Sequence, residues 1–505
     1  MTNPLFKSYQ QNQRFLFPPN LEDLIAANHP VRVVSEVIDR IDIDVIIKKY
    51  KGGGTTSYHP RLLLKVLVYA YLNNVYSSRR IEAAVKENIH FMWLSGMAQP
   101  DHHTINRFRS ERLRNILKEV FAQIVLLLVE SGHVSLKEIY TDGSKIESVA
   151  NRYTFVWGKS IKNNREKIKQ QLKELWAYTQ KVAGEEKGDD TPPDFDKVNS
   201  ESVKATIEKI DAALKDKEVS KDVKQKLNHA RKQWPDKLKH YEKQELLLSG
   251  RNSYSKTDPG ATFMRMKEDM LNGQLKPGYN AQVSTNNQFI VNYSVHTNAA
   301  DPKTLIPHLE RFKQLYNLLP EVEIADAGYG SEENYAYLET NGIEAYVKPM
   351  DFDRKQKSTY QPDVFASEHL EYDADKDEYI CPSGKPMGGI GSEQRSESGI
   401  IKTYHLYRAK GCRGCPLKEA CHKQKDNRII SINHEGRRLK QQAHQRLLTE
   451  KGIYYRKKRS ADVEPVFGNI KNNKNFRRFM LKGIEKTEIE WGLLCIAHNL
   501  KKIAA

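Results

Sequence analysis

Three acidic residues in this sequence have neighbours that suit metal-dependent chemistry. Asp142 closes the strand-like stretch KEIYTD and is followed by glycine and small polar residues, and Asp326 in IADAGYG repeats this arrangement. In α/β sheets, side chains at strand ends emerge into the crevice where sites are built. Glu464 stands directly before Pro465, and proline is compatible with a helix only near its first turn. Glu464 is therefore predicted to lie at the start of a helix.

Carboxylates at three such positions suit a hard divalent cation. Mg²⁺ is typically held by one or two carboxylates together with substrate phosphate oxygens, and it keeps several waters. Two ions roughly 3.5 to 4 Å apart can activate the attacking oxygen and stabilise the leaving oxygen of an in-line phosphoryl displacement. The three acids therefore predict phosphoryl transfer with Mg²⁺, or Mn²⁺, as cofactor. Each aspartate alone also fits a turn or a helix cap, so the interpretation depends on the pair.

A cation accompanies the third acid. Lys471 follows Glu464 by two helical turns, roughly 10.5 Å along the axis, so both side chains are predicted to point the same way. This spacing is too long for a direct ion pair of the i,i+4 type. The sequence therefore predicts one helix face that carries a carboxylate and a separate cation.

Length and charge limit the classes of protein to which this chain can belong. The chain has 505 residues, which suggests about two to four domains. Its formal net charge is +17 and 29% of its residues are charged, which favours a polyanionic partner, with nucleic acid as the leading candidate. The alternative is a basic protein with an ordinary solvated surface.

The chain shows no targeting or membrane signal. Its start, MTNPLFKSYQQNQRF, lacks a basic segment followed by an apolar core, and the longest apolar run, within FAQIVLLLVESG, is far shorter than the roughly 20 residues of a membrane span. A cytoplasmic protein without a membrane partner is expected. Five cysteines, an odd number, argue against a disulfide framework and for reduced thiols or a metal site.

Four of the cysteines form a candidate metal group. Cys412 and Cys415 make a C-x2-C half-site, Cys421 follows, and Cys381 lies thirty residues earlier. Four thiolates suit tetrahedral Zn²⁺ in a structural role, with His422 as a substitute ligand. The alternative is a set of reduced cysteines packed as small hydrophobic residues.

The first 134 residues predict helices. Apolar residues recur at helical spacing between turn and cap signals, and Asp101 is a predicted N-cap. A helix-turn-helix that lays basic side chains on DNA phosphates and a helical bundle with an ordinary charged face both fit this pattern. The basic residues concerned are Arg79, Arg80, Arg107, Arg109, Arg112 and Arg114.

From about residue 136 the pattern changes to a mixed α/β sheet. After the strand KEIYTD, two strands are predicted to join at Asn286 and Asn287, and a helix, a strand, a helix and a strand follow. Asp301 is a predicted N-cap with Pro302 at the first helical position, and Asp258 beside Pro259 is a predicted turn former. Thr487 and Glu490 are a predicted capping box, and Cys495 in the same helix is a predicted core residue.

Two stretches interrupt the sheet. One is rich in Lys and Glu and broken by Pro235, and it predicts a protruding helical hairpin or coiled-coil arm, or else a charged linker. The other holds the four cysteines. The predicted organisation is a helical N-terminal DNA-end-binding domain, 1–134; a catalytic core, 135–158, 251–349 and 446–505; a charged helical insertion, 159–250; and a cysteine-containing insertion, 350–445.

With these motifs in view, the sequence resembles the DDE transposases of bacterial insertion sequences, most closely the IS eleven-eighty-two group, related to the IS-four and IS-five groups. The resemblance runs over nearly the whole chain. It implies a ribonuclease-H-like catalytic core, Mg²⁺ dependence, and cleavage and strand transfer at the ends of a mobile element. It includes YHPRLLLKVLVYAYLNNVYSSRRIE, FMWLSGMAQPDHHTINRFR, DGSKIESVANRYTFVW, GYNAQV, ADAGYGSEENY and VEPVFGNIK.

The resemblance also implies roles for single residues. Asp142, Asp326 and Glu464 match the first, second and third catalytic acids, which hold the metal. Related groups carry a tyrosine, arginine, glutamate, lysine signature around the third acid. Here Lys471 keeps its spacing, whereas four residues rather than three separate Arg459 from the glutamate. Lys471 and Arg459 are expected to contact DNA phosphate near the cut.

The function expected from the resemblance is DNA transposition. Its partners would be the terminal inverted repeats of the element and target DNA, with a homodimer on paired ends and association with the nucleoid when bound to DNA. Two alternatives remain open: a nuclease of the same fold that hydrolyses without strand transfer, and a non-catalytic basic DNA-binding regulator derived from a transposase.

Overall fold

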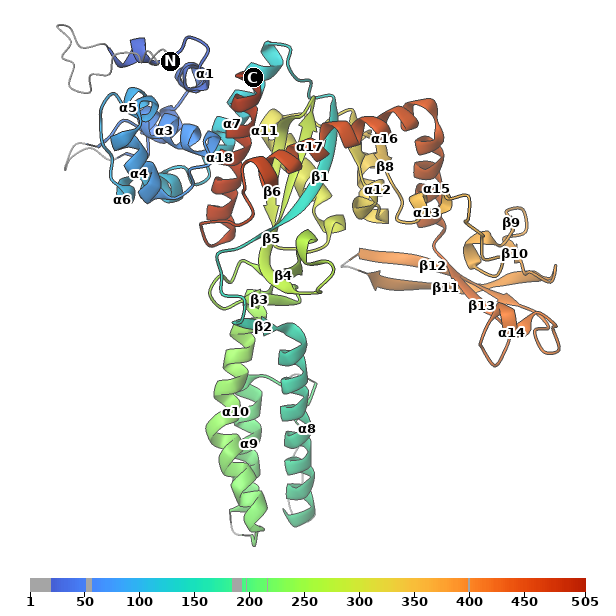
Figure 1. The fold of residues 1–505 in the computed structure, drawn as a ribbon. Helices are drawn as coiled ribbons and strands as arrows, with labels where there is room; N and C mark the ends of the chain where they lie inside the picture. The colour runs from blue at the N-terminus through green and yellow to red at the C-terminus, as the bar shows by residue number, and fades with distance from the viewer. Residues whose placement is uncertain (1–19, 51–56, 184–192, 197, 216, 398–399) are drawn as a thin grey trace, which may run out of the picture.

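A six-stranded mixed sheet forms the centre of the computed structural model, which describes residues 20–50, 57–183, 193–196, 198–215, 217–397 and 400–505 (Figure 1). The N-terminal stretch in which no targeting signal was expected lies outside these residues. The strand order is β4-β5-β1-β7-β8, and β6 also pairs with β5. The strands are β1 (Glu138–Glu147), β4 (Thr262–Arg265), β5 (Leu275–Asn286), β6 (Phe289–His296), β7 (Val322–Ala325) and β8 (Glu344–Val347).

Strand β1 has different neighbours along its length. Residues Glu138 to Thr141 pair in parallel with β7, and Tyr140 to Glu147 pair antiparallel with β5. The prediction that Asp142 closes its strand is therefore wrong, because β1 continues to Glu147. Asp142 instead lies one residue beyond the last pair between β1 and β7, and on the same side of β1 the next bridge joins Glu147 to Arg478.

Helices cover both faces of the sheet. On one face Tyr140 and Tyr346 contact Tyr455 of α16, with ring centroids 6.4 and 4.7 Å apart. On the other face Ser284 hydrogen-bonds His308 of α11 at 2.8 Å. The helices around the sheet are η4 (Asp301–Lys303), α11 (Leu305–Tyr316), η5 (Ala327–Tyr329), α12 (Glu332–Thr340), α15 (His434–Leu448), α16 (Glu450–Asp462), α17 (Glu464–Gly468), the π-helical η7 (Asn469–Asn473) and α18 (Ile484–Ile503).

The turn between β5 and β6 is displaced by one residue from its predicted position. Asn286 still pairs with Phe289, and the two central residues are Asn287 and Gln288, with φ of 51° and 62°. Positive φ at both central positions is the type I′ geometry that matches the twist of a hairpin. The predicted hairpin is confirmed, and its turn centre moves one residue along the chain.

The N-terminal helices share one hydrophobic core with the sheet and with α18. Leu67 of α3, Phe121 of α7, Tyr293 of β6 and Trp491 of α18 all belong to this buried cluster. Asp101 accepts a hydrogen bond from Thr104 N and is the N-cap of α6, as predicted. The elements are η1 (Leu21–Leu24), α1 (Pro30–Arg40), α2 (Asp44–Ile47), α3 (Pro60–Leu72), α4 (Ser78–Glu87), α5 (Ile89–Leu94), α6 (His102–Arg107), the π-helical η2 (Phe108–Arg112) and α7 (Leu117–Glu130).

A buried polar network fastens these helices to α18. Glu490 is fully buried and accepts hydrogen bonds from the backbone amides of Met480 and Leu481 at 2.9 and 3.1 Å. Tyr71 of α3 donates to Glu490 at 3.5 Å and accepts from Arg109 at 3.1 Å. The predicted capping box is therefore wrong, because α18 begins at Ile484, upstream of Glu490. Burial raises the pKa of the Glu490 carboxyl, and the nearby Arg109 opposes this.

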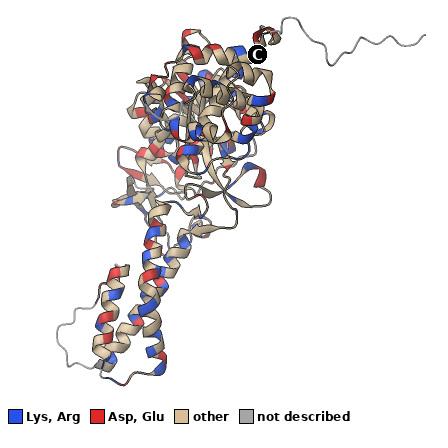
Figure 2. Cartoon of the chain, turned by 90° about the vertical axis from the view of Figure 1, so that its left-hand side faces the viewer, with Lys and Arg blue, Asp and Glu red and all other residues tan. Residues whose placement is uncertain are grey.

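The Lys- and Glu-rich insertion folds into a three-helix arm that extends from the sheet (Figure 1). The arm has its own core, with Trp176 and Trp234 buried in it. Pro235 does not break the arm as predicted, because it lies inside one continuous helix. In the view of Figure 2, basic and acidic residues are interleaved along the arm. Its elements are β2 (Phe155–Trp157), α8 (Gly158–Ala183), α9 (Ser200–Leu214), α10 (Lys221–Leu248) and β3 (Ser253–Ser255).

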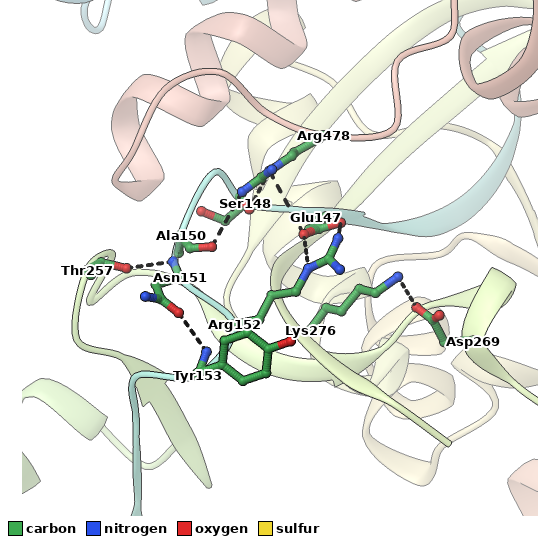
Figure 3. Close-up of polar contacts among 10 residues, drawn as sticks. All are labelled: Glu147, Ser148, Ala150, Asn151, Arg152, Tyr153, Thr257, Asp269, Lys276 and Arg478. Carbon is green, nitrogen blue, oxygen red and sulfur yellow. Dashed lines mark hydrogen bonds and ion pairs between the residues drawn. The ribbon is translucent and has the colours of Figure 1, made fainter. Parts of the chain in front are cut away.

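Polar contacts fix the junction between β1 and the arm (Figure 3). Arg478 Nε donates to the Ser148 carbonyl at 3.1 Å, and Arg152 Nε donates to Glu147 Oε1 at 2.9 Å. Ser148 Oγ donates to Asp258 Oδ2 at 2.6 Å. The prediction of a simple turn former at Asp258 was too limited, because the side chain is 1% exposed and serves as a buried acceptor.

The cysteine-containing stretch forms a second sheet with the order β13-β12-β11-β10-β9. A small separate core that includes Tyr379, Met387 and Tyr407 supports it. Its elements are α13 (Phe352–Lys355), η6 (Ser367–His369), β9 (Tyr372–Asp373), β10 (Glu378–Ile380), β11 (Pro386–Glu397), β12 (Ile400–Ala409), α14 (Lys418–Cys421) and β13 (Ile429–Ile432). One further short element of the chain is η3 (Lys267–Asp269).

The mixed α/β class with an N-terminal helical region is confirmed, and the sheet is compatible with a ribonuclease-H-like core. Within the described residues, no helix is long and apolar enough to cross a membrane. The predicted domain boundaries stay a prediction.

Replacement of Arg109 by leucine tests the buried network. The substitution leaves the Glu490 carboxylate without its nearby cation, and loss of one partner from a buried charge network costs about 3–5 kcal/mol. We expect a clearly lower urea midpoint in circular dichroism. The control is Arg107→Leu, an exposed neighbour, for which the change should stay within about 0.5 kcal/mol. Equal midpoints for the two variants would contradict the role assigned to Arg109.

Candidate active site

The two aspartates of the predicted site meet where β7 ends. Thr141 pairs with Ala325 in the parallel register, so Asp142 and Asp326 are the residues that directly follow this last pair between β1 and β7. Asp326 directly follows β7, as predicted, and its Oδ1 accepts a hydrogen bond from Gly328 N at 2.8 Å. This is the edge at which α/β sheets present functional side chains.

Burial and neighbouring acids perturb Asp142. Burial raises the pKa of its carboxyl to about 6, the negative charges of Asp326 and Asp301 add to the rise, and Arg459 opposes it. The Asp142 side chain is 20% exposed. A carboxyl with this environment gains from a nearby cation, since an opposite charge favours its ionised form.

One guanidinium links the first acid to the third. Arg459 Nη1 lies 3.4 Å from Asp142 Oδ2, and Nη2 lies 3.4 Å from Glu464 Oε1. Glu464 is the first residue of α17, and Pro465 occupies the first turn, which confirms the predicted helix start. Glu464 is 55% exposed, whereas Arg459 is 13% exposed. The structure therefore brings Asp142, Asp326 and Glu464 to one edge of the sheet, the third through a shared arginine.

Lys471 does not lie on a regular helix with Glu464. The α-helix ends at Gly468 and a π-helical turn, Asn469–Asn473, follows, so the predicted spacing of 3.6 residues per turn fails there. Lys471 Nζ donates to Glu268 at 3.3 Å. Its predicted contact with DNA phosphate stays a prediction.

Sequence reasoning assigned a fourth acid at this edge to helix capping. Asp301 was predicted to be an N-cap, but it lies inside the short helix η4, whose N-cap is Ala300. A Cβ added at Gly328 would stand 2.9 Å from Asp326 Oδ1 and 3.2 Å from Asp301 Oδ2. The two carboxylates therefore flank one glycine. Burial raises the pKa of Asp301, the hydrogen bond from Asn280 opposes this, and the charge of Asp326 adds to it.

The predicted DNA-binding arginines differ in exposure. Arg79, Arg80 and Arg107 are exposed, as a surface that contacts phosphate requires. Arg109 is 3% exposed and donates to Tyr71, Asn106 and the carbonyl of Tyr76. Its assignment to DNA binding is therefore corrected, because its hydrogen bonds hold it inside the protein.

The acids suit a divalent cation by donor type and charge, although they are not arranged as a complete ligand set. Within the described part of the chain, no group of three or more His, Cys, Asp or Glu side chains is positioned to hold a metal ion. Mg²⁺ commonly takes only one or two protein carboxylates, with water and phosphate oxygens as its other ligands. The adjacent Asp142 and Asp326 fit that requirement.

The four predicted zinc ligands line one cavity. Cys381, Cys412, Cys415 and Cys421 surround a space of about 20 Å³. They are free thiols, and Arg428 Nη1 donates to the sulfur of Cys421 at 3.2 Å. Zinc binding stays a prediction. Cys495 is fully buried, which confirms its place in the core.

The fold and the acidic edge are compatible with the class of nucleic-acid enzymes built on a DDE, ribonuclease-H-like core. Comparison with protein families agrees with this class: residues 380–504 match the family described as Transposase DDE domain, and residues 19–111 match Transposase domain (DUF772). These matches indicate a DDE transposase of the insertion-sequence type, and the group within that type stays a prediction. No curated protein and no solved structure matches the chain.

Replacement of Gly143 by alanine tests the packing beside Asp142. An added Cβ would overlap the side-chain amide of Gln282. Overpacking of this kind costs about 1–3 kcal/mol, so we expect a lower urea midpoint. Gly468→Ala is the control, because nothing lies within 4 Å of its added Cβ and alanine favours a helix by up to about 1 kcal/mol over glycine. A Gly143→Ala variant as stable as the wild type would contradict the close packing of Gln282 against Gly143.

Proposed function

We propose that this protein is a transposase that cleaves phosphodiesters at the ends of an insertion sequence and joins the freed 3′-hydroxyl to target DNA. The observation that carries the proposal is the adjacency of Asp142 and Asp326 where β7 ends, with Glu464 linked to Asp142 through Arg459. Both reactions are in-line phosphoryl transfers, so one set of side chains serves both.

In the proposed site, Asp142, Asp326 and Glu464 would hold Mg²⁺ or Mn²⁺. When bound, the divalent ions polarise phosphoryl oxygens and lower the pKa of water. Asp142 lies on β1 and Asp326 directly follows the neighbouring strand β7, whereas Glu464 stands on a separate helix and is half exposed. Arg459 neutralises carboxylate charge between the two elements and would also position a DNA phosphate.

The proposed partners are the terminal inverted repeats and target DNA. The net charge of +17 and the exposed Arg79, Arg80 and Arg107 in the region that matches a transposase domain support the binding of DNA ends by the N-terminal helices. A homodimer on paired ends is proposed, with the charged arm as an element of assembly. Two features support a role of the arm in assembly: it has its own hydrophobic core, and it extends away from the sheet (Figure 1).

Replacement of Asp326 by asparagine tests the reaction. The ion would lose an anionic ligand, and several kcal/mol of transition-state stabilisation correspond to about 10²-fold or more in rate. We expect Asp142→Asn and Asp326→Asn to lose Mg²⁺-dependent nicking of an end-containing duplex by at least that factor. Both should still bind the duplex in a gel-shift assay.

The control is Asp375→Asn, an exposed acid between β9 and β10 of the second sheet, which should cleave normally. Full cleavage by Asp326→Asn would refute the proposal. A wild-type protein that binds without cleaving would identify a DNA-binding regulator, and cleavage without joining to a supercoiled plasmid would identify a nuclease.

We also propose structural Zn²⁺ on Cys381, Cys412, Cys415 and Cys421, supported by the single cavity they line. Protein purified without chelator should contain about one zinc per chain by elemental analysis, as one four-thiolate site requires. Cys415→Ser should reduce that content strongly, and Cys495→Ala, which changes a core thiol, should not. A wild-type protein without stoichiometric zinc would rule out this part of the proposal.

A further inference from the structure

We propose that the root of the three-helix arm carries a DNA-binding surface, which holds phosphates of the DNA segment beside the cleaved bond. This root surface consists of Arg152, Tyr153, Lys276 and Arg478 (Figure 3). None of these residues belongs to the N-terminal helices for which the binding of DNA ends is proposed above. The inference rests on the proposed function, because it names a further contact of the same DNA substrate.

The guanidiniums of the root surface lie outside the carboxylate that neutralises part of their charge. Arg152 Nε and Nη2 donate to Glu147 at 2.9 and 3.0 Å, and Arg478 Nε lies 3.9 Å from the same carboxylate. The side chain of Glu147 is 12% exposed, whereas those of Arg152 and Arg478 are 38% and 44% exposed. One mostly buried carboxylate therefore serves two guanidiniums, and the side that faces solvent is cationic.

Lys276 joins this cluster through a second carboxylate. Its Nζ lies 2.6 Å from Asp269 Oδ2, and the Asp269 side chain is the more buried of the two. Hydrogen bonds to Glu147 raise the pKa of Arg152, burial opposes this rise, and the charges of Glu147, Asp269 and Tyr153 add to it. The phenol of Tyr153 and both carboxylates therefore lie close enough to act on one guanidinium.

Tyr153 is 81% exposed, although the backbone that carries it is anchored. Its amide donates to Asn151 Oδ1 at 2.8 Å, and the amide of Asn151 donates to Thr257 Oγ1 at 2.8 Å (Figure 3). A side chain on a fixed backbone loses less freedom when it binds a partner. Tyrosine hydroxyls are among the common donors to phosphate oxygens. Tyr153 therefore adds a neutral donor beside the two guanidiniums.

The root surface is connected to the acidic edge by two routes. Along β1, Glu147 lies five residues after Asp142, which corresponds to about 17 Å. From the helical segment after the third acid, Lys471 donates to Glu268 at 3.3 Å, and Glu268 directly precedes Asp269. One DNA strand advances about 3.4 Å per nucleotide. DNA cleaved at Asp142 would therefore reach the root surface about five nucleotides from the cut.

Phosphate fits this surface better than a protein partner does. Guanidiniums bind phosphate oxygens through charge-assisted hydrogen bonds, and each neutralised phosphate releases counterions. In a symmetric dimer the same patch of both copies would meet, so that cations would face cations. The net charge of +17 agrees with a polyanionic partner.

The experiment measures the affinity of the full-length protein for a fluorescent duplex that carries the element end, by anisotropy at several salt concentrations without added Mg²⁺. Arg152→Gln should weaken binding about tenfold and lower the slope of log affinity against log salt by about one, as the loss of one phosphate contact requires. Arg152→Lys keeps the charge and should keep the slope. Tyr153→Ala, which removes an exposed side chain, should weaken binding about fivefold.

The matched control is Arg438→Gln. Arg438 is 40% exposed and forms ion pairs with Glu339 and Glu435, so it resembles Arg152 in exposure and pairing but lies on α15. We expect this variant to bind the duplex with the affinity and the salt slope of the wild type. The urea midpoints of all four variants, measured by circular dichroism, show whether they are folded.

An unchanged salt slope in Arg152→Gln would overturn the inference. An equal loss of affinity in Arg152→Gln and Arg152→Lys would also overturn it, because the guanidinium would then act only through Glu147. Wild-type DNA affinity in Arg152→Gln and Tyr153→Ala together with altered self-association in light scattering would assign the surface to protein contacts instead. None of these measurements involves cleavage. The proposed function fails separately if Asp142→Asn and Asp326→Asn cleave DNA normally.

Phosphate ethylation tests the position of the contact. Ethylation about five nucleotides from the cut should interfere with duplex binding by the wild type and by Arg438→Gln, but not by Arg152→Gln, because that variant no longer contacts the phosphate. The same interference pattern in all three proteins would contradict the placement of DNA on the root surface.

Discussion

The contact between Gln282 and Gly143 is the constraint on which the acidic edge depends. Because Gly143 has no side chain, the amide of Gln282 can lie against β1 directly after Asp142. From there it bonds Asn280 on its own strand and accepts from Tyr329 in the turn after β7. Gln282 is also fixed by its backbone, since its carbonyl accepts from the indole of Trp491 at 3.2 Å. A buried amide with these partners fixes three segments that are distant in the sequence.

Much of the site could be predicted because its signals are local. The position of Asp326 was predicted from a short apolar strand that is followed by an acid and small residues. The helix start at Glu464 was predicted from the proline that follows it. The same reasoning misjudged β1. The sequence after Asp142 looks like a turn, but pairing with β5 keeps it extended to Glu147. The neighbouring strand β7 ends beside Thr141, one residue before Asp142. The length of β7 cannot be predicted from the residues of β1.

The errors concern residues whose partners are far along the chain. Pro302 after Asp301 is a typical helix-cap signal. In the structure, however, the Asp301 carboxylate accepts a hydrogen bond from Asn280, which lies 21 residues away in the sequence. Arg109 looked like part of a basic surface, although a tyrosine 38 residues away binds it inside the protein. The predicted alignment of Lys471 with Glu464 assumed 3.6 residues per turn. The π-helical turn Asn469–Asn473 does not have this period. A buried polar residue at an otherwise surface-like position is visible only after folding.

Arg459 shows how such a site can stay folded and remain open to a substrate. Its two nitrogens reach Asp142 and Glu464 at 3.4 Å, longer than the roughly 2.7–2.9 Å of a good charge-assisted hydrogen bond. Its Nη1 is buried and makes no hydrogen bond among the described residues. The guanidinium therefore balances charge without strong directional bonds. Glu464, on its own short helix and half exposed, can exchange this contact for others at small cost, whereas Asp142 and Asp326 are held by the sheet. A rigid pair of acids and one adjustable acid suit the two successive reactions of the proposed function, which would use different DNA strands at a single edge.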